Sequence, residues 1–183
     1  MKPFVVVFAG VPGSSKSIVA HYLSEVFGLP IFSNDNLRFE VREDLLLDDI
    51  TSPKANEEYE KRSTARRREM LARGRSFILD ASVDRRWATL KPELEQVGLR
   101  WFLIDMELSR SFMKQLYQKT GRPNAVLELD AYFQQHQDFM AKFAGEVHLK
   151  ITDETFKDRL HVSEAALKDF LQNLEKAAQA VKI

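Results

Sequence analysis

The sequence predicts a single α/β domain in which helices cover both faces of a mainly parallel sheet. Apolar runs at residues 4–8, 77–79 and 101–104 are continuous rather than alternating, which is typical of strands buried on both faces. Helical patterns separate these runs along the whole chain. The 183 residues suffice for one domain with a real core, without repeats or an internal linker.

Each element has its own local signal. We expect five strands, at residues 4–8, 30–32, 77–80, 101–105 and 147–151. Gly28 suits the C-terminus of the first helix, and Ser52-Pro53 is typical of an N-cap followed by proline at the first helical position. Asp84 can cap a helix toward Gly98 that Pro92 kinks or splits. We expect helices at about 17–27, 52–74, 84–98, 107–118, 125–143 and from 164 onward.

The composition excludes several classes of function. There are 27 Lys plus Arg and 27 Asp plus Glu, so no global positive field attracts a polyanion. Zero cysteines exclude disulfides and thiolate chemistry. No stretch approaches the roughly 18 apolar residues of a membrane span. We therefore expect a soluble, cytoplasmic protein without a membrane partner, whose oligomeric state the sequence does not reveal.

A basic segment at residues 61–75 follows an acidic one at residues 40–60, and we expect the two to share a helix. Its Arg66-Arg67-Arg68 run is either a solvated helix face, which we favour, or a phosphate-binding patch.

The turn after the first strand carries the most informative motif. It has a glycine followed five residues later by Ser-Lys-Ser, and it opens a helix: Gly10-Val11-Pro12-Gly13-Ser14-Ser15-Lys16-Ser17. Such a loop binds a triphosphate through inward backbone N–H groups, a lysine on the β- and γ-phosphates and a hydroxyl on Mg²⁺. Lys16 and Ser17 are the residues for the last two tasks. The alternative is a glycine-containing βα turn without a ligand.

One position departs from this motif. Glycine is expected directly before the lysine, and the chain has Ser15 there. A side chain at that position costs about 1 to 2 kcal/mol if the backbone is left-handed. The Ser15 N–H can still bind phosphate, so nucleotide binding is not excluded. Because of the side chain, however, we expect either a weaker affinity for the nucleotide or a degenerate site.

Polar residues that follow the other strands complete the candidate site. Asp80 ends the third strand and is the better candidate for holding Mg²⁺ together with Ser17. Asp35 follows the second strand and can accept a proton from an attacking hydroxyl, while Arg38 can bind an incoming phosphate or carboxylate. The alternative role for Asp35 and Asp84 is helix capping, which we favour for Asp84 only.

These residues together resemble a known family. The loop motif, Asn34-Asp35-x-x-Arg38, Leu79-Asp80-Ala81-Ser82 with Arg85-Arg86 and then Asp105 are similar to the P-loop kinases of the polynucleotide 5′-kinase and zeta-toxin-like group, over residues 4–151. The resemblance implies a three-layer α/β/α P-loop NTPase fold over residues 1–183, with a small helical lid at about 110–143. It also implies Asp35 as the general base and Arg38 as an acceptor contact.

The lid region departs from the family pattern. Leu116 and Thr120 stand where arginines are expected, although Lys114, Lys119 and Arg122 are near. Because such a cation is worth about 10³-fold or more in rate, its absence predicts a poor catalyst. We expect the nucleotide to be bound by Gly10, Pro12, Gly13, Ser14, Ser15, Lys16, Ser17 and Arg122.

The remaining candidates are weaker. The four histidines show no metal spacing, so we expect them on the surface or in helices: His21, His136, His148 and His161. Four aromatic residues are most simply core or interface side chains, although Trp87 can alternatively line an acceptor pocket: Tyr59, Trp87, Trp101 and Tyr132.

The sequence therefore predicts a kinase that moves the γ-phosphate of ATP, with Mg²⁺, to a hydroxyl of a small molecule. Lys16, Asp35 and Arg38 are its candidate catalytic residues, and Ser17 and Asp80 its candidate metal ligands. Two alternatives stay open. One is a nucleotide-binding regulatory module without catalysis, and the other, not favoured, is a nucleic-acid 5′-hydroxyl kinase.

Overall fold

The computed structural model describes residues 3–46, 52–121 and 123–180 of the chain. Its sheet has five strands in the order β2-β3-β1-β4-β5, and every strand pairing in the described ranges is parallel. The strands are β1 (Phe4–Ala9), β2 (Ile31–Ser33), β3 (Phe77–Ser82), β4 (Arg100–Glu107) and β5 (Leu149–Thr152). The predicted five-stranded parallel α/β fold is confirmed.

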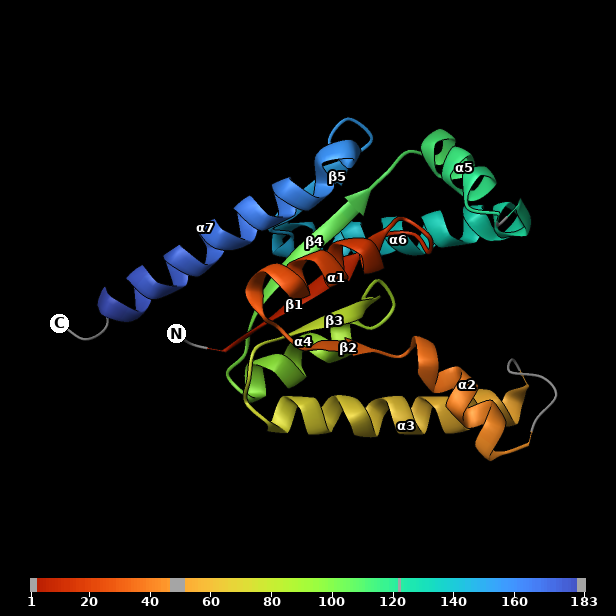
Figure 1. Cartoon of the computed structure of the whole chain (residues 1–183), viewed down its shortest axis with the longest axis horizontal. Coiled ribbons are helices and arrows are strands. Elements are labelled where there is room, and N and C mark those ends of the chain that lie inside the picture. Colours follow the sequence, from red (N-terminus) through yellow and green to blue (C-terminus); the bar gives the residue numbers. More distant parts are fainter. Residues whose placement is uncertain (1–2, 47–51, 122, 181–183) are drawn as a thin grey trace.

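Helices form the layers on either side of this sheet (Figure 1). The α-helices are α1 (Lys16–Phe27), α2 (Asp35–Asp44), α3 (Pro53–Ala72), α4 (Trp87–Gln96), α5 (Arg110–Lys119), α6 (Leu129–Phe143) and α7 (Arg159–Ala180). Short 3₁₀ segments are η1 (Pro123–Glu128), η2 (Ala144–Glu146) and η3 (Phe156–Asp158). Helices α1 and α7 pack on one face of the sheet, and α4, α6 and the end of α3 pack on the other.

The central strand β1 shows why its sequence is continuously apolar. Val5, Val7 and Ala9 join the core on the α4 and α6 side. The residues between them alternate to the α1 and α7 side, and all six residues of the strand are buried. A strand covered on both faces gains burial at every position, whereas a half-exposed strand gains it at every second one.

The strand register brings three carboxylates to the beginning of the turn after β1. Ala9 pairs with Asp105 of β4, and Asp80 of β3 lies at the same end of the sheet beside β2. The chain after β3 continues along β1, because the Val83 N–H donates to the Phe8 carbonyl at 2.8 Å. Asp84 therefore arrives next to Gly10. Ligands of open parallel sheets bind at this carboxyl end.

The helix boundaries differ from the expected ones in three places. Helix α2, which ends at Asp44, is not among the expected helices, whereas α3, from Pro53 to Ala72, matches the helix expected at about 52–74. Helix α4 begins at Trp87 and continues through Pro92, with Leu90 and Leu94 buried on either side. Helix α7 begins at Arg159, five residues earlier than expected, directly after η3. None of the helices in the described ranges is long and apolar enough to cross a membrane.

Candidate functional site

The turn between β1 and α1 has the backbone of an anion-binding loop. Three of its residues have positive φ angles: Gly10 at 117°, Gly13 at 79° and Ser15 at 77°. A Cβ on Gly13 would lie 2.7 Å from the Tyr117 ring of α5, so this glycine is required by close packing as well as by φ. The first N–H groups of a helix such as α1 have no partner within the helix. They are therefore available to an anion bound over the turn.

Lys16 lies buried against this turn. Its ammonium group donates to the carbonyls of Gly10 at 2.7 Å and Val11 at 2.8 Å, and to Ser14 Oγ at 3.2 Å. Burial lowers the pKa of Lys16 to about 8, although nearby carboxylates oppose the shift. These carbonyls are neutral partners, so a phosphate would be a stronger acceptor for the same group.

Ser17 and Asp80 meet as the motif predicts. Ser17 Oγ donates to Asp80 Oδ1 at 2.9 Å, and Asp80 is buried at the end of β3. A hydroxyl and a carboxylate are hard oxygen donors, and Mg²⁺ is typically held by one or two protein ligands with water and phosphate completing its shell. The described residues hold no cluster of three or more His, Cys, Asp or Glu side chains that could bind a metal. The pair fits Mg²⁺ bound together with a nucleotide.

The departure at Ser15 has a structural counterpart. Ser15 adopts the left-handed conformation with φ 77° and ψ 18°, and its Oγ accepts a hydrogen bond from Arg159 Nε at 3.2 Å. The Arg159 guanidinium also lies 4.3 Å from the centre of the Phe156 ring, and burial lowers its pKa. The serine side chain thus binds a cation that comes from the start of α7.

Asp84, His136 and Asp105 form a buried network beneath the turn. Asp84 accepts the Gly10 N–H at 3.0 Å. His136 of α6 bridges two carboxylates, with Nδ1 at 3.1 Å from Asp84 and Nε2 at 3.3 Å from Asp105. Asp105 has no exposed surface, and neither of its oxygens makes a hydrogen bond of good geometry within the described ranges. The His136 cation is therefore the direct neighbour that offsets its charge.

One expectation about this network was wrong. Asp84 does not cap α4, because the N-cap is Arg86 and Asp84 binds the turn instead. His136 lies in a helix, α6, which is one of the two placements expected for the histidines, and it is buried there with 7% of its surface exposed. Burial lowers the pKa of His136, but contacts with Asp105 and Asp84 outweigh this effect and raise the pKa to about 9. Burial raises the pKa of Asp84, and the His136 contacts and the Gly10 N–H reverse this to a net lowering.

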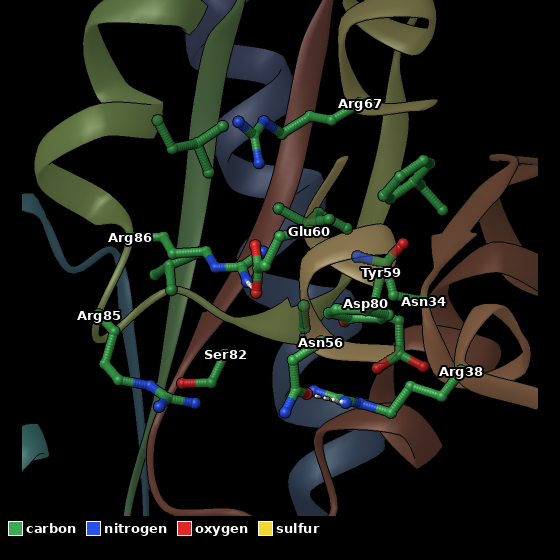
Figure 2. A pocket seen from close by; sticks show the side chains of 15 residues that line it. Asn34, Arg38, Asn56, Tyr59, Glu60, Arg67, Asp80, Ser82, Arg85 and Arg86 are labelled. Atoms are coloured by element: carbon green, nitrogen blue, oxygen red, sulfur yellow. Dashed lines mark hydrogen bonds and ion pairs between the residues drawn. The ribbon is translucent and has the colours of Figure 1, made fainter. Parts of the chain in front are cut away.

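A cavity of about 660 Å³ opens beside the turn, between the ends of β2 and β3 and the helices α2 and α3 (Figure 2). Asp80 lines it, so the cavity adjoins the Ser17–Asp80 pair. Arg38 also lines it and donates to Asn56 Oδ1 at 3.0 Å, with its guanidinium 4.0 Å from the centre of the Tyr59 ring. Asp35 begins α2, one residue after Asn34, which lines the same cavity.

The other residues considered in the sequence lie in the core, in the cavity lining, in ion pairs or on the surface. Trp87 is fully buried against Trp101, with ring centroids 5.6 Å apart, and belongs to the core rather than the cavity. Tyr59 lines the cavity. Arg66 pairs with Glu40 and Arg67 with Glu93, at 2.5 and 3.0 Å. Lys114 and Lys119 are exposed on α5, and Arg122 lies outside the described residues.

No pattern in the sequence points to Arg159 or to a site role for His136. Arg159 is 144 residues from Ser15, and no spacing rule connects them. One signal was present for the network: Asp84 and Asp105 each follow or end an apolar strand run, which places them at the carboxyl end of the sheet. Two such acids predict a buried cation between them, and His136 lies on a helix that crosses this end.

The central strand β1 is followed by a glycine-containing turn that ends in Lys16 and Ser17 and then by helix α1. Together with the strand order β2-β3-β1-β4-β5, this arrangement defines a P-loop NTPase fold. A family model described as an AAA domain (AAA_33) matches residues 5–177, and the chain belongs to this family. The narrower grouping with polynucleotide 5′-kinases and zeta-toxin-like kinases stays a prediction.

Solved structures of P-loop kinases share the fold. A gluconokinase from Sinorhizobium meliloti is 18% identical with a TM-score of 0.66, covering 96% of this chain and 98% of that one. A shikimate kinase from Acinetobacter baumannii is 17% identical with a TM-score of 0.57 over 93% and 94%. An APS kinase from Mycobacterium tuberculosis is 18% identical with a TM-score of 0.55 over 91% and 98%. No curated protein sequence matches the chain.

Proposed function

We propose that the protein transfers the γ-phosphate of ATP to a hydroxyl group of a small-molecule acceptor. The observation that carries the proposal is the contact between Ser17 and Asp80, which joins a P-loop to a cavity of about 660 Å³. This volume lies within the range of roughly 300 to 1,000 Å³ that is typical of small-molecule sites. The gluconokinase, shikimate kinase and APS kinase with the same fold are named for small acceptors, and the APS kinase structure holds both AMPPNP and APS.

Each residue has a defined task in this reaction. Lys16 and the N–H groups of the turn hold the phosphates, and Ser17 and Asp80 would hold Mg²⁺, which offsets the phosphate charge. Asp35 accepts the proton of the acceptor hydroxyl, whose oxygen bonds to the γ-phosphorus while the bond to the β–γ bridging oxygen breaks. Arg38 orients the acceptor. Residues 110–143 close over the nucleotide as a lid, with Arg122 as a phosphate contact.

Radiolabelled ATP tests the proposal with a panel of nucleosides, sugars, small alcohols and oligonucleotides. We expect label transfer to a small hydroxyl compound. Lys16→Ala should abolish both nucleotide binding and transfer, because the ammonium group binds the β- and γ-phosphates. Asp35→Ala should keep ATP binding and lose transfer, roughly 10² to 10⁴-fold. If transfer survives Asp35→Ala, the assignment of the base is wrong.

Calorimetry with ATP and Mg²⁺ separates this function from the alternatives. Binding without transfer to any acceptor favours a regulatory module. Transfer to oligonucleotides with a steep loss of binding in added salt favours a nucleic-acid kinase. The ion pairs of Arg66, Arg67, Arg73 and Arg86 with glutamates reduce the positive charge that such a groove requires.

A further inference from the structure

The charges that line the cavity are not balanced. Among the described residues, its lining has four arginines and two acids: Arg38, Arg67, Arg85, Arg86, Glu60 and Asp80. Charged groups at the wall of a small-molecule site usually fix the orientation of a ligand or pair with one another. An arginine that is already paired with an acid has little charge left for a ligand. The arginines that are not paired therefore indicate the charge of the ligand that the cavity binds.

Two of the arginines are neutralised by the protein itself. Arg86 forms an ion pair with Glu60 across the cavity wall. Arg67 binds the Glu93 carboxylate through both Nε and an NH₂ group, at 3.0 and 3.3 Å, and its side chain is only 15% exposed. A two-point contact of this kind is a well-formed pair, and it leaves little charge for a ligand.

The other two arginines have no carboxylate partner in the described part of the chain. Arg38 is held by a neutral amide, Asn56, and by the face of Tyr59. These contacts fix its position without cancelling its charge. Arg85 is exposed, and none of the hydrogen bonds or ion pairs of the described residues involves it. Figure 2 shows the Arg38 and Arg85 side chains extending toward each other from opposite walls, Arg38 from α2 and Arg85 from the segment after β3.

An acceptor that fills the cavity displaces water from both guanidinium groups. A neutral acceptor would leave them without a counter-charge, and this costs binding free energy. A carboxylate or phosphate would instead accept several charge-assisted hydrogen bonds from them. In the proposed reaction the Asp80 side receives the phosphates of ATP, so the anionic group of the acceptor is better placed at the arginine side of the cavity.

We propose that the acceptor is a hydroxylated anion, whose carboxylate or phosphate group is bound between Arg38 and Arg85. Its reacting hydroxyl lies at the Asp80 side of the cavity, on a different carbon from the anionic group. This inference rests on the proposed phosphotransfer and adds the charge of the acceptor to it. Arg85 is the new specificity-determining residue, since Arg86, its neighbour in sequence, is already paired with Glu60.

Matched acceptors test the charge directly. Phosphate transfer from Mg-ATP is measured for glycerol, glycerate and glycerol 3-phosphate, and for ribitol and ribonate. We expect kcat/KM for an anionic member to exceed that of its neutral counterpart by at least roughly 10-fold, the size of one hydrogen bond to a charged group. Preference for glycerate or for glycerol 3-phosphate identifies the anion as carboxylate or phosphate.

A substitution at Arg85 tests the residue. Arg85→Gln should raise KM for the anionic acceptor by roughly 10- to 100-fold, with KM for ATP and the use of neutral acceptors unchanged. Arg85→Lys, which keeps the charge but not the planar fork, should give a smaller rise. Arg73→Gln is the matched control, because Arg73 is exposed at the end of α3, pairs with Glu69 and does not line the cavity.

The inference and the proposed function can fail separately. Equal use of neutral and anionic acceptors, or an Arg85→Gln variant with an unchanged preference, would overturn the inference and leave phosphotransfer standing. If no compound is phosphorylated, the same pairs are titrated by calorimetry into protein with AMPPNP and Mg²⁺. Binding of the anion alone, lost in Arg85→Gln, then supports the inference without transfer, and equal or absent binding of both members contradicts it.

Discussion

Ser15 combines an unfavourable backbone conformation with a favourable side-chain contact. Its φ of 77° is a conformation that glycine adopts without strain, whereas a residue with a Cβ loses about 1 kcal/mol or more there. The hydrogen bond from Arg159 to its Oγ, at 3.2 Å, recovers part of this loss. The two effects can be separated because one depends on the Cβ and the other on the hydroxyl.

Alanine and glycine at position 15 should therefore differ in stability. Ser15→Ala keeps the strained Cβ and loses the Arg159 contact, so we expect it to lower the free energy of unfolding by about 1 kcal/mol. Ser15→Gly loses the same contact but relieves the strain, so it should stay within about 0.5 kcal/mol of the natural protein. Urea unfolding of the three proteins measures both values. Equal stability of the alanine and glycine variants would show that strain is not stored at this residue.

At the scale of elements, α5 supports the turn between β1 and α1. The Tyr117 hydroxyl donates to the Pro12 carbonyl at 2.6 Å. A Cβ added to Gly13 would lie only 2.7 Å from Cε1 of the Tyr117 ring. The Tyr117 ring of α5 can therefore pack directly on the turn because Gly13 has no side chain. This contact lies directly behind the turn whose N–H groups would face a phosphate.

Gly13→Ala should disrupt this support. The added methyl group combines a φ of 79° with an overlap against Tyr117, so we expect a loss of more than about 2 kcal/mol in the free energy of unfolding and at least 10-fold weaker ATP binding. Gly28→Ala is the control, because Gly28 has a φ of 63° and open space where the Cβ would be. Urea unfolding and calorimetry with ATP compare them. If both variants lose the same amount, backbone strain alone accounts for the effect.

Elements that are determined by short stretches of sequence could be predicted from the sequence. The five strands and the turn of residues 10–17 follow from apolar runs and from glycine and lysine at fixed offsets, and all are present in the structure. The start of α7 at Arg159 is earlier than expected, although Asp158, directly before it, is a residue type that caps helices. This start is continuous with η3, which packs Phe156 against Phe112 of α5.

The same distinction holds for the candidate site. Lys16, Ser17 and Asp80 could be placed by motif, and Ser17 does contact Asp80. The roles of Asp84 and His136 depend on a contact across 52 residues, which no local pattern encodes. A histidine without metal-ligand spacing is expected to be structural or exposed, and only the fold shows that two buried acids surround this one.

At the scale of the whole molecule, one buried network joins four elements. Gly10 at the end of β1, Asp84 after β3, Asp105 of β4 and His136 of α6 are connected by contacts of 3.0 to 3.3 Å. Because Asp105 is fully buried and solvent cannot stabilise a carboxylate there, the protonated form of His136 gains from the contacts with Asp105 and Asp84. The stability of the domain should therefore depend on pH through this histidine.

The sign of this dependence follows from the pKa. His136 has a pKa of about 9 in the folded protein, against 6.5 for a histidine in the unfolded chain. Its contribution is fully present below pH 6.5 and is lost as the pH rises through 9, a total of about 3 kcal/mol. The lowered pKa of Lys16, about 8, acts in the opposite direction above that pH. The interval from pH 6.5 to 8 therefore isolates the histidine.

We expect the free energy of unfolding to fall by about 1.5 kcal/mol between pH 6.5 and 8 in the natural protein, measured by urea unfolding. In His136→Gln the decline should disappear. This variant should also be about 3 kcal/mol or more less stable at pH 6.5, because the buried Asp105 side chain loses its neighbouring cation. Adding Asp105→Asn should restore much of that loss, since the buried charge is then gone. Parallel pH curves for the natural protein and His136→Gln would show that another group carries the dependence.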